Sequence, residues 1–233
     1  MKIQLLKRLE ELPLFTFNEF VRISGKEPVY ARTILYRAKK DGQIHQVERG
    51  KYTMHEDPLV FASYIIIPSY ISFWTALQFR GLTEQLPRDF MIASPRPKKP
   101  LKFAGARIAF FTNRHLWGYR KERYQGLDIF VAEAEKAIID CFLLKNVPFE
   151  EAAKAMSDRK LNTERLIGYV ERTGSGALAK RIGFLLETAG QKAGSLEKMI
   201  DGKYILLDWS GHLKGIKDRK WKIIINRRVD DIG

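Results

Sequence analysis

The stretch from Pro28 to Met54, PVYARTILYRAKKDGQIHQVERGKYTM, decides the fold of the N-terminal part of the chain. In its first half, small and aliphatic side chains recur every three to four residues, which is the period of an amphipathic helix. Pro28 suits the first helical position, and Gly42 suits the left-handed position after a helix. We therefore predict a helix that begins at Pro28, ends before Gly42 and buries a stripe consisting of Ala31, Ile34, Leu35 and Ala38.

The opposite face of this predicted helix is basic and aromatic. It carries Arg32, Thr33, Tyr36, Arg37 and Lys40. An arginine side chain can bind O6 and N7 of guanine with two hydrogen bonds, whereas a lysine mostly neutralises phosphates without reading the base sequence. The residue types on this face are therefore those of a helix that contacts DNA.

After Gly42, two short segments that favour strands are joined by Arg49 and Gly50. A glycine in this position favours a tight turn, so we predict a β-hairpin. Arg49 and Lys51 lie at its turn and are placed, together with Lys40, to neutralise phosphates.

Two shorter helices are expected before Pro28. Residues 2–11 have helical periodicity, and Thr16 with Glu19 forms a capping-box pattern that begins a second helix ending at Gly25. Three helices followed by a basic hairpin are typical of a winged helix-turn-helix domain. In that fold the third helix enters the major groove, and the hairpin contacts an adjacent groove or phosphates.

Composition limits the function classes. The formal net charge is +14 at pH 7, which favours a polyanionic partner. The single cysteine, Cys141, excludes a disulfide scaffold and a cysteine-based zinc site, so we expect no metal and no cofactor. The most apolar window, from Val60 to Trp74, contains Pro68 and is too short to span a bilayer. We expect a cytoplasmic protein without a membrane partner.

Beyond residue 56 the pattern mixes helices and strands, so the predicted fold class is α+β: an N-terminal winged helix-turn-helix domain followed by a larger mixed α+β domain. We place the domains at residues 1–56 and 57–233, and the second allows a subdivision near residue 146. Helices are expected at residues 59–66, 72–80, 133–144, 149–156, 163–173 and 178–188, and strands at residues 90–93, 107–111, 127–131, 204–207 and 222–225.

Several short motifs recur in one order along the chain. They are Gly42-Gln43-Ile44 through Arg49-Gly50-Lys51-Tyr52, Pro68–Ser72 with Ala76-Leu77 and Gly81–Thr83, Ala93–Arg96, Glu135–Ala137 with Asp140, Leu178–Gly183, and Trp221–Asn226. In these motifs and their order the whole chain resembles the AbiEi antitoxin family, the transcriptional-regulator antitoxins of type IV toxin–antitoxin systems, which act in abortive infection and antiviral defence.

The resemblance implies an N-terminal winged helix that binds inverted repeats of double-stranded DNA in its own promoter, with Arg32, Thr33, Tyr36, Arg37, Arg49 and Lys51 in the DNA-binding element. It also implies a C-terminal region that counteracts a nucleotidyltransferase toxin functionally, without a stable complex. The family's additional basic surface corresponds by position to Lys180, Arg181, Lys217, Arg219 and Lys220. Neither role requires catalysis, so the chain is not expected to be an enzyme.

Three alternatives remain open at this point. The basic helical face could be only a solvated surface, and a winged helix can bind protein in place of DNA. Asp208, Asp218 and Lys220 loosely match the carboxylates and lysine of a magnesium-dependent nuclease. Nucleotidyl transfer would need paired carboxylates that hold Mg²⁺, and Asp230-Asp231 is not such a pair, because neighbouring side chains on a strand point to opposite faces.

Overall fold

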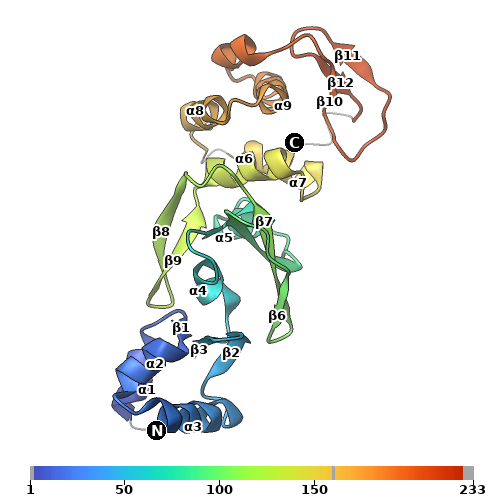
Figure 1. Cartoon of the computed structure of the whole chain (residues 1–233). Helices are drawn as coiled ribbons and strands as arrows, with labels where there is room; N and C mark the ends of the chain where they lie inside the picture. The colour runs from blue at the N-terminus through green and yellow to red at the C-terminus, as the bar shows by residue number, and fades with distance from the viewer. Residues whose placement is uncertain (1–2, 159–160, 228–233) are drawn as a thin grey trace. The chain divides into compact units, whose positions relative to one another are not determined.

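The computed structural model describes residues 3–158 and 161–227, and these form a mixed α+β protein, as predicted (Figure 1). Two units can be distinguished. The first combines the described residues up to Ile71 with Arg88–Val131, and the second combines Ser72–Pro87 with the described residues from Ala132 on. The domain limits expected at residues 56 and 146 stay predictions, and Lys2 and Asp230-Asp231 lie outside the described residues.

The first unit begins with the predicted helices. These elements are α1 (Ile3–Glu10), β1 (Phe15–Thr16), α2 (Phe17–Ser24) and α3 (Pro28–Lys40). Thr16 caps α2 because its hydroxyl oxygen accepts a hydrogen bond from the Glu19 backbone N–H, while the Glu19 carboxylate accepts one from the Thr16 N–H at 2.7 Å. Gly25 ends α2 at a φ of 59°. The predicted capping box and the predicted end of α2 at Gly25 are therefore confirmed.

The predicted hairpin consists of β2 (His45–Glu48) and β3 (Lys51–Thr53), which pair antiparallel. Gly50 adopts a φ of 80° in the turn, a conformation that glycine reaches without steric cost. β1 adds to the other side of β3, so the sheet order is β1-β3-β2. The three predicted helices and the predicted hairpin are therefore present in the expected order, with β1, which the sequence did not predict, between α1 and α2.

The core of this region is formed where α3 meets the other two helices and the hairpin. Its buried members are Leu9, Phe15, Phe20, Ala31, Leu35, Ala38 and Ile44. The Phe15 ring stacks on Phe20 and on Tyr52, with centroids 6.2 and 6.1 Å apart. Ala31, Leu35 and Ala38 of the predicted α3 stripe are buried and Ile34 is partly buried, which confirms which side of α3 faces inward.

A six-stranded sheet completes the first unit. Its members are β4 (Tyr70–Ile71), β5 (Asp89–Ser94), β6 (Leu101–Phe103), β7 (Ala106–Thr112), β8 (Tyr119–Tyr124) and β9 (Leu127–Ala132), in the order β6-β7-β5-β4-β9-β8. The expected strands at residues 90–93, 107–111 and 127–131 are confirmed. The helix expected at residues 59–66 is shorter: α4 covers Pro58–Phe61, and a 3₁₀ turn covers Ala62–Tyr64.

The second unit is mostly helical. Its helices are α5 (Phe73–Phe79), α6 (Ala134–Leu144), α7 (Phe149–Met156), α8 (Thr163–Thr173), α9 (Gly176–Thr188) and a 3₁₀ helix at Gly194–Met199, and its strands are β10 (Ile205–Leu206), β11 (Ile216–Asp218) and β12 (Ile223–Ile225). Cys141 lies buried in α6, where burial raises the pKa of its thiol well above the usual value. It is therefore a core residue.

Trp221 joins the small sheet of the second unit to α9. The indole is 1% exposed, and its Nε1–H donates a hydrogen bond to a Glu187 carboxylate oxygen at 2.7 Å. Its ring covers Gly183 so closely that a Cβ atom added there would lie 2.0 Å from a ring carbon. The close contact with the Trp221 ring therefore requires glycine at position 183. Backbone conformation does not require it, because the φ of Gly183 lies outside the left-handed region.

We expect Gly183→Ala to destabilise the protein by about 1–3 kcal/mol or more, because the added methyl group overpacks a close contact. Gly168→Ala is the matched control, since Gly168 lies in α8 and an added Cβ would have no neighbour within 4 Å. Alanine there should stabilise by up to about 1 kcal/mol. Urea denaturation of both variants measures the difference, and equal stabilities would contradict the packing argument.

Candidate nucleic-acid interface

α2 and α3 are separated by the short turn Gly25–Glu27, the connection that a helix-turn-helix requires. Figure 1 shows α3 beside α1 and α2 in the N-terminal group of helices. Its five predicted interface residues, Arg32, Thr33, Tyr36, Arg37 and Lys40, are all exposed. The structure therefore brings these residues together on one accessible side of a single helix.

Positive charge on this side of α3 is open to a partner. Within the described residues, Arg37 and Lys40 form no ion pair, and the Arg32 guanidinium lies 5.4 Å from the centroid of the Phe17 ring in α2. Lys39 behaves differently, because it donates a hydrogen bond to Gln46 of β2. Lys39 thus holds α3 to the hairpin, while the other three cations remain outside the packed core.

Apolar side chains lie beside these charges. Val29, Tyr30 and Tyr36 are 81%, 54% and 67% exposed. Sequence reasoning included Tyr36 but missed Val29 and Tyr30, although Pro28 at the helix start already implies their position in the first turn. In a recognition helix, residues of the first turns reach base edges, and an apolar side chain there can contact the methyl group of thymine.

The hairpin contributes its two predicted cations unequally. Arg49 is exposed at the turn, whereas the Lys51 ammonium donates to the Ile65 carbonyl and lies 3.1 Å from a Glu48 carboxylate oxygen. The other Glu48 oxygen pairs with Lys98. Burial acts to raise the pKa of Glu48, but the hydrogen bonds from Lys98 and Lys51 outweigh it and lower the pKa. Arg49 is therefore the cation of the turn that has no ion-pair partner within the described residues.

Lys180, predicted to belong to an additional basic surface, is instead in the interior. It is 1% exposed, its ammonium pairs with Asp201, and it also donates to the Lys203 carbonyl. A buried ammonium has to be paired because the loss of hydration is costly. These contacts tie α9 to the segment before β10, so the prediction for Lys180 is corrected to a structural role.

Arg181 requires the same correction. It is 4% exposed, and its Nε–H donates to the carbonyl oxygens of Leu206 and Leu207 at 3.0 and 3.1 Å. The guanidinium lies 5.8 Å from the centroid of Trp209. Burial lowers the pKa of Arg181 to about 10, with a smaller opposing effect from Asp208. Arg181 therefore anchors the end of β10 and the residue after it, and its side chain is buried.

The other three predicted cations of this surface are exposed. Lys217 and Arg219 are in or next to β11, with the Lys217 ammonium 5.2 Å from the Tyr204 ring centroid. Lys220 pairs with Glu187 of α9 and with Glu197 of the 3₁₀ helix. The basic surface of the second unit is thus smaller than expected.

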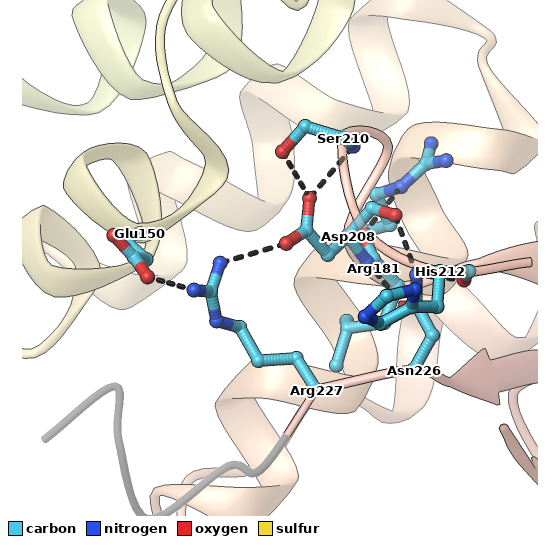
Figure 2. Close-up of polar contacts among 8 residues, drawn as sticks. Glu150, Arg181, Asp208, Ser210, His212, Asn226 and Arg227 are labelled. Atoms are coloured by element: carbon cyan, nitrogen blue, oxygen red, sulfur yellow. Dashed lines mark hydrogen bonds and ion pairs between the residues drawn. The ribbon is translucent and has the colours of Figure 1, made fainter.

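Asp208, one of the residues considered for a nuclease, lies in a pocket of the second unit (Figure 2). It is 2% exposed; one carboxylate oxygen accepts hydrogen bonds from the N–H and O–H of Ser210, each at 2.7 Å, and the other accepts one from Arg227. Figure 2 shows the Arg227 guanidinium between Asp208 and Glu150, with which it also pairs. Asn226 donates a hydrogen bond to the Asp208 carbonyl.

The other two nuclease candidates have different partners. An Asp218 oxygen accepts a hydrogen bond from the Trp221 N–H at 2.6 Å, and Lys220 pairs with glutamates. Residues 3–158 and 161–227 contain no group of three or more His, Cys, Asp or Glu side chains arranged to hold a metal ion. Asp208 and Asp218 each complete local hydrogen-bond networks, so their geometry does not favour the nuclease alternative.

A second buried polar group involves residues that carry the family resemblance. Lys136 and Asp140 in α6 are both fully buried and form an ion pair, and the Ser72 hydroxyl donates to Asp140 at 2.7 Å. Burial lowers the pKa of Lys136, and Asp140 opposes that effect. This group connects α6 to the residue before α5 and has the geometry of a structural anchor.

Comparison of the chain with models of known protein families and with curated protein sequences gives no match. Among the helices in the described residues, none combines the length and apolar composition needed to cross a membrane. The case for a function therefore depends on the geometry of the side chains themselves.

Replacing Arg181 tests its corrected role. We expect Arg181→Ala to cost roughly 2–4 kcal/mol of stability, because the Leu206 and Leu207 carbonyl groups lose their donor and the Leu207 bond is buried. Arg219→Ala removes the same charge from an exposed site and should change stability by less than about 0.5 kcal/mol. Thermal and urea unfolding measure the stabilities of the two variants. A similarly small loss of stability in both would contradict the structural role of Arg181.

Proposed function

We propose that the protein is a DNA-binding transcriptional regulator, acting in the cytoplasm, whose N-terminal winged helix reads double-stranded DNA with α3. One observation carries this proposal: an exposed side of α3 on which Arg37 and Lys40 form no ion pair within the described residues, next to a hairpin with exposed Arg49. A helix in the major groove needs such a side, and a hairpin beside it can contact phosphates.

The resemblance to AbiEi antitoxins supports a narrower version of this proposal. In it, the protein represses its own operon by binding repeats in the promoter and counteracts a nucleotidyltransferase toxin without catalysis of its own. Expression of a nucleotidyltransferase encoded beside its gene tests this version. We expect growth arrest that co-expression of the protein relieves. Arrest that persists would contradict the antitoxin role and leave only the proposed role as a transcriptional regulator.

A second candidate function is protein binding by the winged helix. The exposed Val29, Tyr30 and Tyr36 favour it, because an apolar group on a surface is typical of protein interfaces. In that case the protein would show no affinity for DNA even at low salt.

Selection from a pool of random DNA duplexes tests the regulator. We expect enrichment of one motif, with binding to it that weakens steeply as salt rises, because each neutralised phosphate releases counterions. The region upstream of the gene should contain the motif. Failure to enrich any sequence, together with no gel shift at low salt, would contradict DNA binding and favour the protein partner.

Arg37 and Lys40 should affect binding in different ways. Arg37→Ala is expected to weaken binding to the selected motif by about 1–3 kcal/mol and to relax preference at one or two base pairs. Lys40→Ala should weaken binding to selected and random duplexes alike and reduce the salt slope by about 1. Arg120→Ala on β8, where Arg120 pairs with Glu122, is the control for the change in net charge. Fluorescence anisotropy on both duplexes measures this, and identical effects of the two variants would argue against base reading by Arg37.

A further inference from the structure

The segment from Pro95 to Pro100, PRPKKP, joins β5 to β6 in the first unit and carries charge that the α3 interface does not use. Arg96 and Lys99 are exposed, and Lys98 is partly buried. The segment contains no acidic residue, and neither Arg96 nor Lys99 forms an ion pair within the described residues. It is therefore a strongly basic, accessible loop.

Lys98 attaches this loop to the hairpin. Its ammonium pairs with Glu48 of β2 and lies 5.8 Å from the centroid of the Phe110 ring. Glu48 is the acidic residue of the hairpin, and its other oxygen already pairs with Lys51 at 3.1 Å. Two ammonium groups thus neutralise one carboxylate, so the joined surface of loop and hairpin keeps an excess of positive charge.

The loop is also held in shape. Pro95, Pro97 and Pro100 each fix one backbone angle and lack an N–H group. At its start, the hydroxyl of the buried Ser94 donates to the Arg96 carbonyl at 2.9 Å. A cation on an ordered segment loses less conformational entropy on binding than one on a mobile tail.

Arg96 lies beside the N-terminal helices. It lines one surface pocket together with Lys51 of β3 and with Thr16 and Glu19 at the start of α2. The Glu19 carboxylate is occupied by the Thr16 N–H and hydroxyl. In helix-turn-helix proteins the helix before the recognition helix crosses the phosphate backbone, so this place is suited to a phosphate contact.

We propose that the Pro95–Pro100 loop is a second phosphate-binding arm next to the hairpin. Arg96 and Lys99 bind backbone phosphates of the duplex outside the base pairs that α3 reads. Their contacts add affinity and lengthen the footprint without adding base specificity, because phosphates are the same at every step. This inference depends on the proposed DNA binding.

The test compares two double variants of the full chain. R96A/K99A removes two positive charges from the arm. R120A/K121A lowers the net charge by the same amount on β8, where Arg120 pairs with Glu122 and Lys121 with Asp128, and so controls for net charge alone. The sheet order places β8 at the opposite edge from β6, which directly follows the arm. Each is titrated by fluorescence anisotropy against the selected duplex at several salt concentrations and against the same duplex shortened to the base pairs that define the motif.

For R96A/K99A we expect the slope of log affinity against log salt to be smaller by about 2, at about 0.9 per lost phosphate contact. The R120A/K121A slope should equal that of the wild type. On the shortened duplex, wild type and R96A/K99A should bind equally, because the flanking phosphates are absent. Ethylation interference should show two phosphates that matter to the wild type and not to R96A/K99A.

The failures of the two proposals can be told apart. Wild-type binding with an unchanged slope in R96A/K99A would overturn the arm alone, and so would an equal loss in R120A/K121A. No binding by the wild type would overturn the proposed function itself. Urea unfolding of both variants verifies that they are folded; an R96A/K99A variant that proves unstable is replaced by R96Q/K99Q, which keeps most of the side-chain length.

Discussion

Burial of one side of α3 against α1, α2 and the hairpin is the interaction on which the N-terminal region depends. Leu35 packs in the same cluster as Leu9, Phe15 and Phe20, and burial of each such side chain stabilises the fold by about 1.5–3 kcal/mol. The rotation of α3 about its axis is set by this contact. Because the inward residues are small or aliphatic, the long basic and aromatic residues have to lie on the other side.

This constraint explains how much could be predicted from sequence. The period of α3, the Thr16–Glu19 capping box and the turn at Gly50 are local features, and each involves residues that are close in the chain. Local chemistry is sufficient to specify them. The limits of α2 and α3, and the exposure of Arg37, follow directly and were predicted correctly.

The errors concern features that depend on distant partners. Lys180 and Arg181 look like surface residues in a sequence, since charged side chains are mostly exposed. They are buried because Asp201 and the carbonyls of Leu206 and Leu207 accept from them, over twenty residues away along the chain. β8 was missed for a related reason: YRKERY is a charged edge strand without an alternating apolar face.

Whether a cation is paired within the fold also decides whether it contributes to a basic surface. Lys51, Lys98 and Lys180 all count toward the net charge of +14, yet each is paired with a carboxylate of its own unit. Charge that is neutralised within the fold contributes little to the attraction of a polyanion. The cations that matter are exposed and lack such a partner within the described residues. In the first unit they include Arg37 and Lys40 on α3, Arg49 in the hairpin, and Arg96 and Lys99 in the Pro95–Pro100 loop.

A merely solvated helix face would be expected to carry charged and small polar groups, with no reason to expose large apolar ones. α3 instead exposes Val29 and Tyr36 beside Arg37 and Lys40, although Ala or Glu at either position would favour the helix more. Cations alone would suit solvent, and apolar groups alone would suit a protein. Base edges in a major groove present acceptors, thymine methyl groups and nearby phosphates together, so a mixed surface of this kind supports the proposed DNA binding.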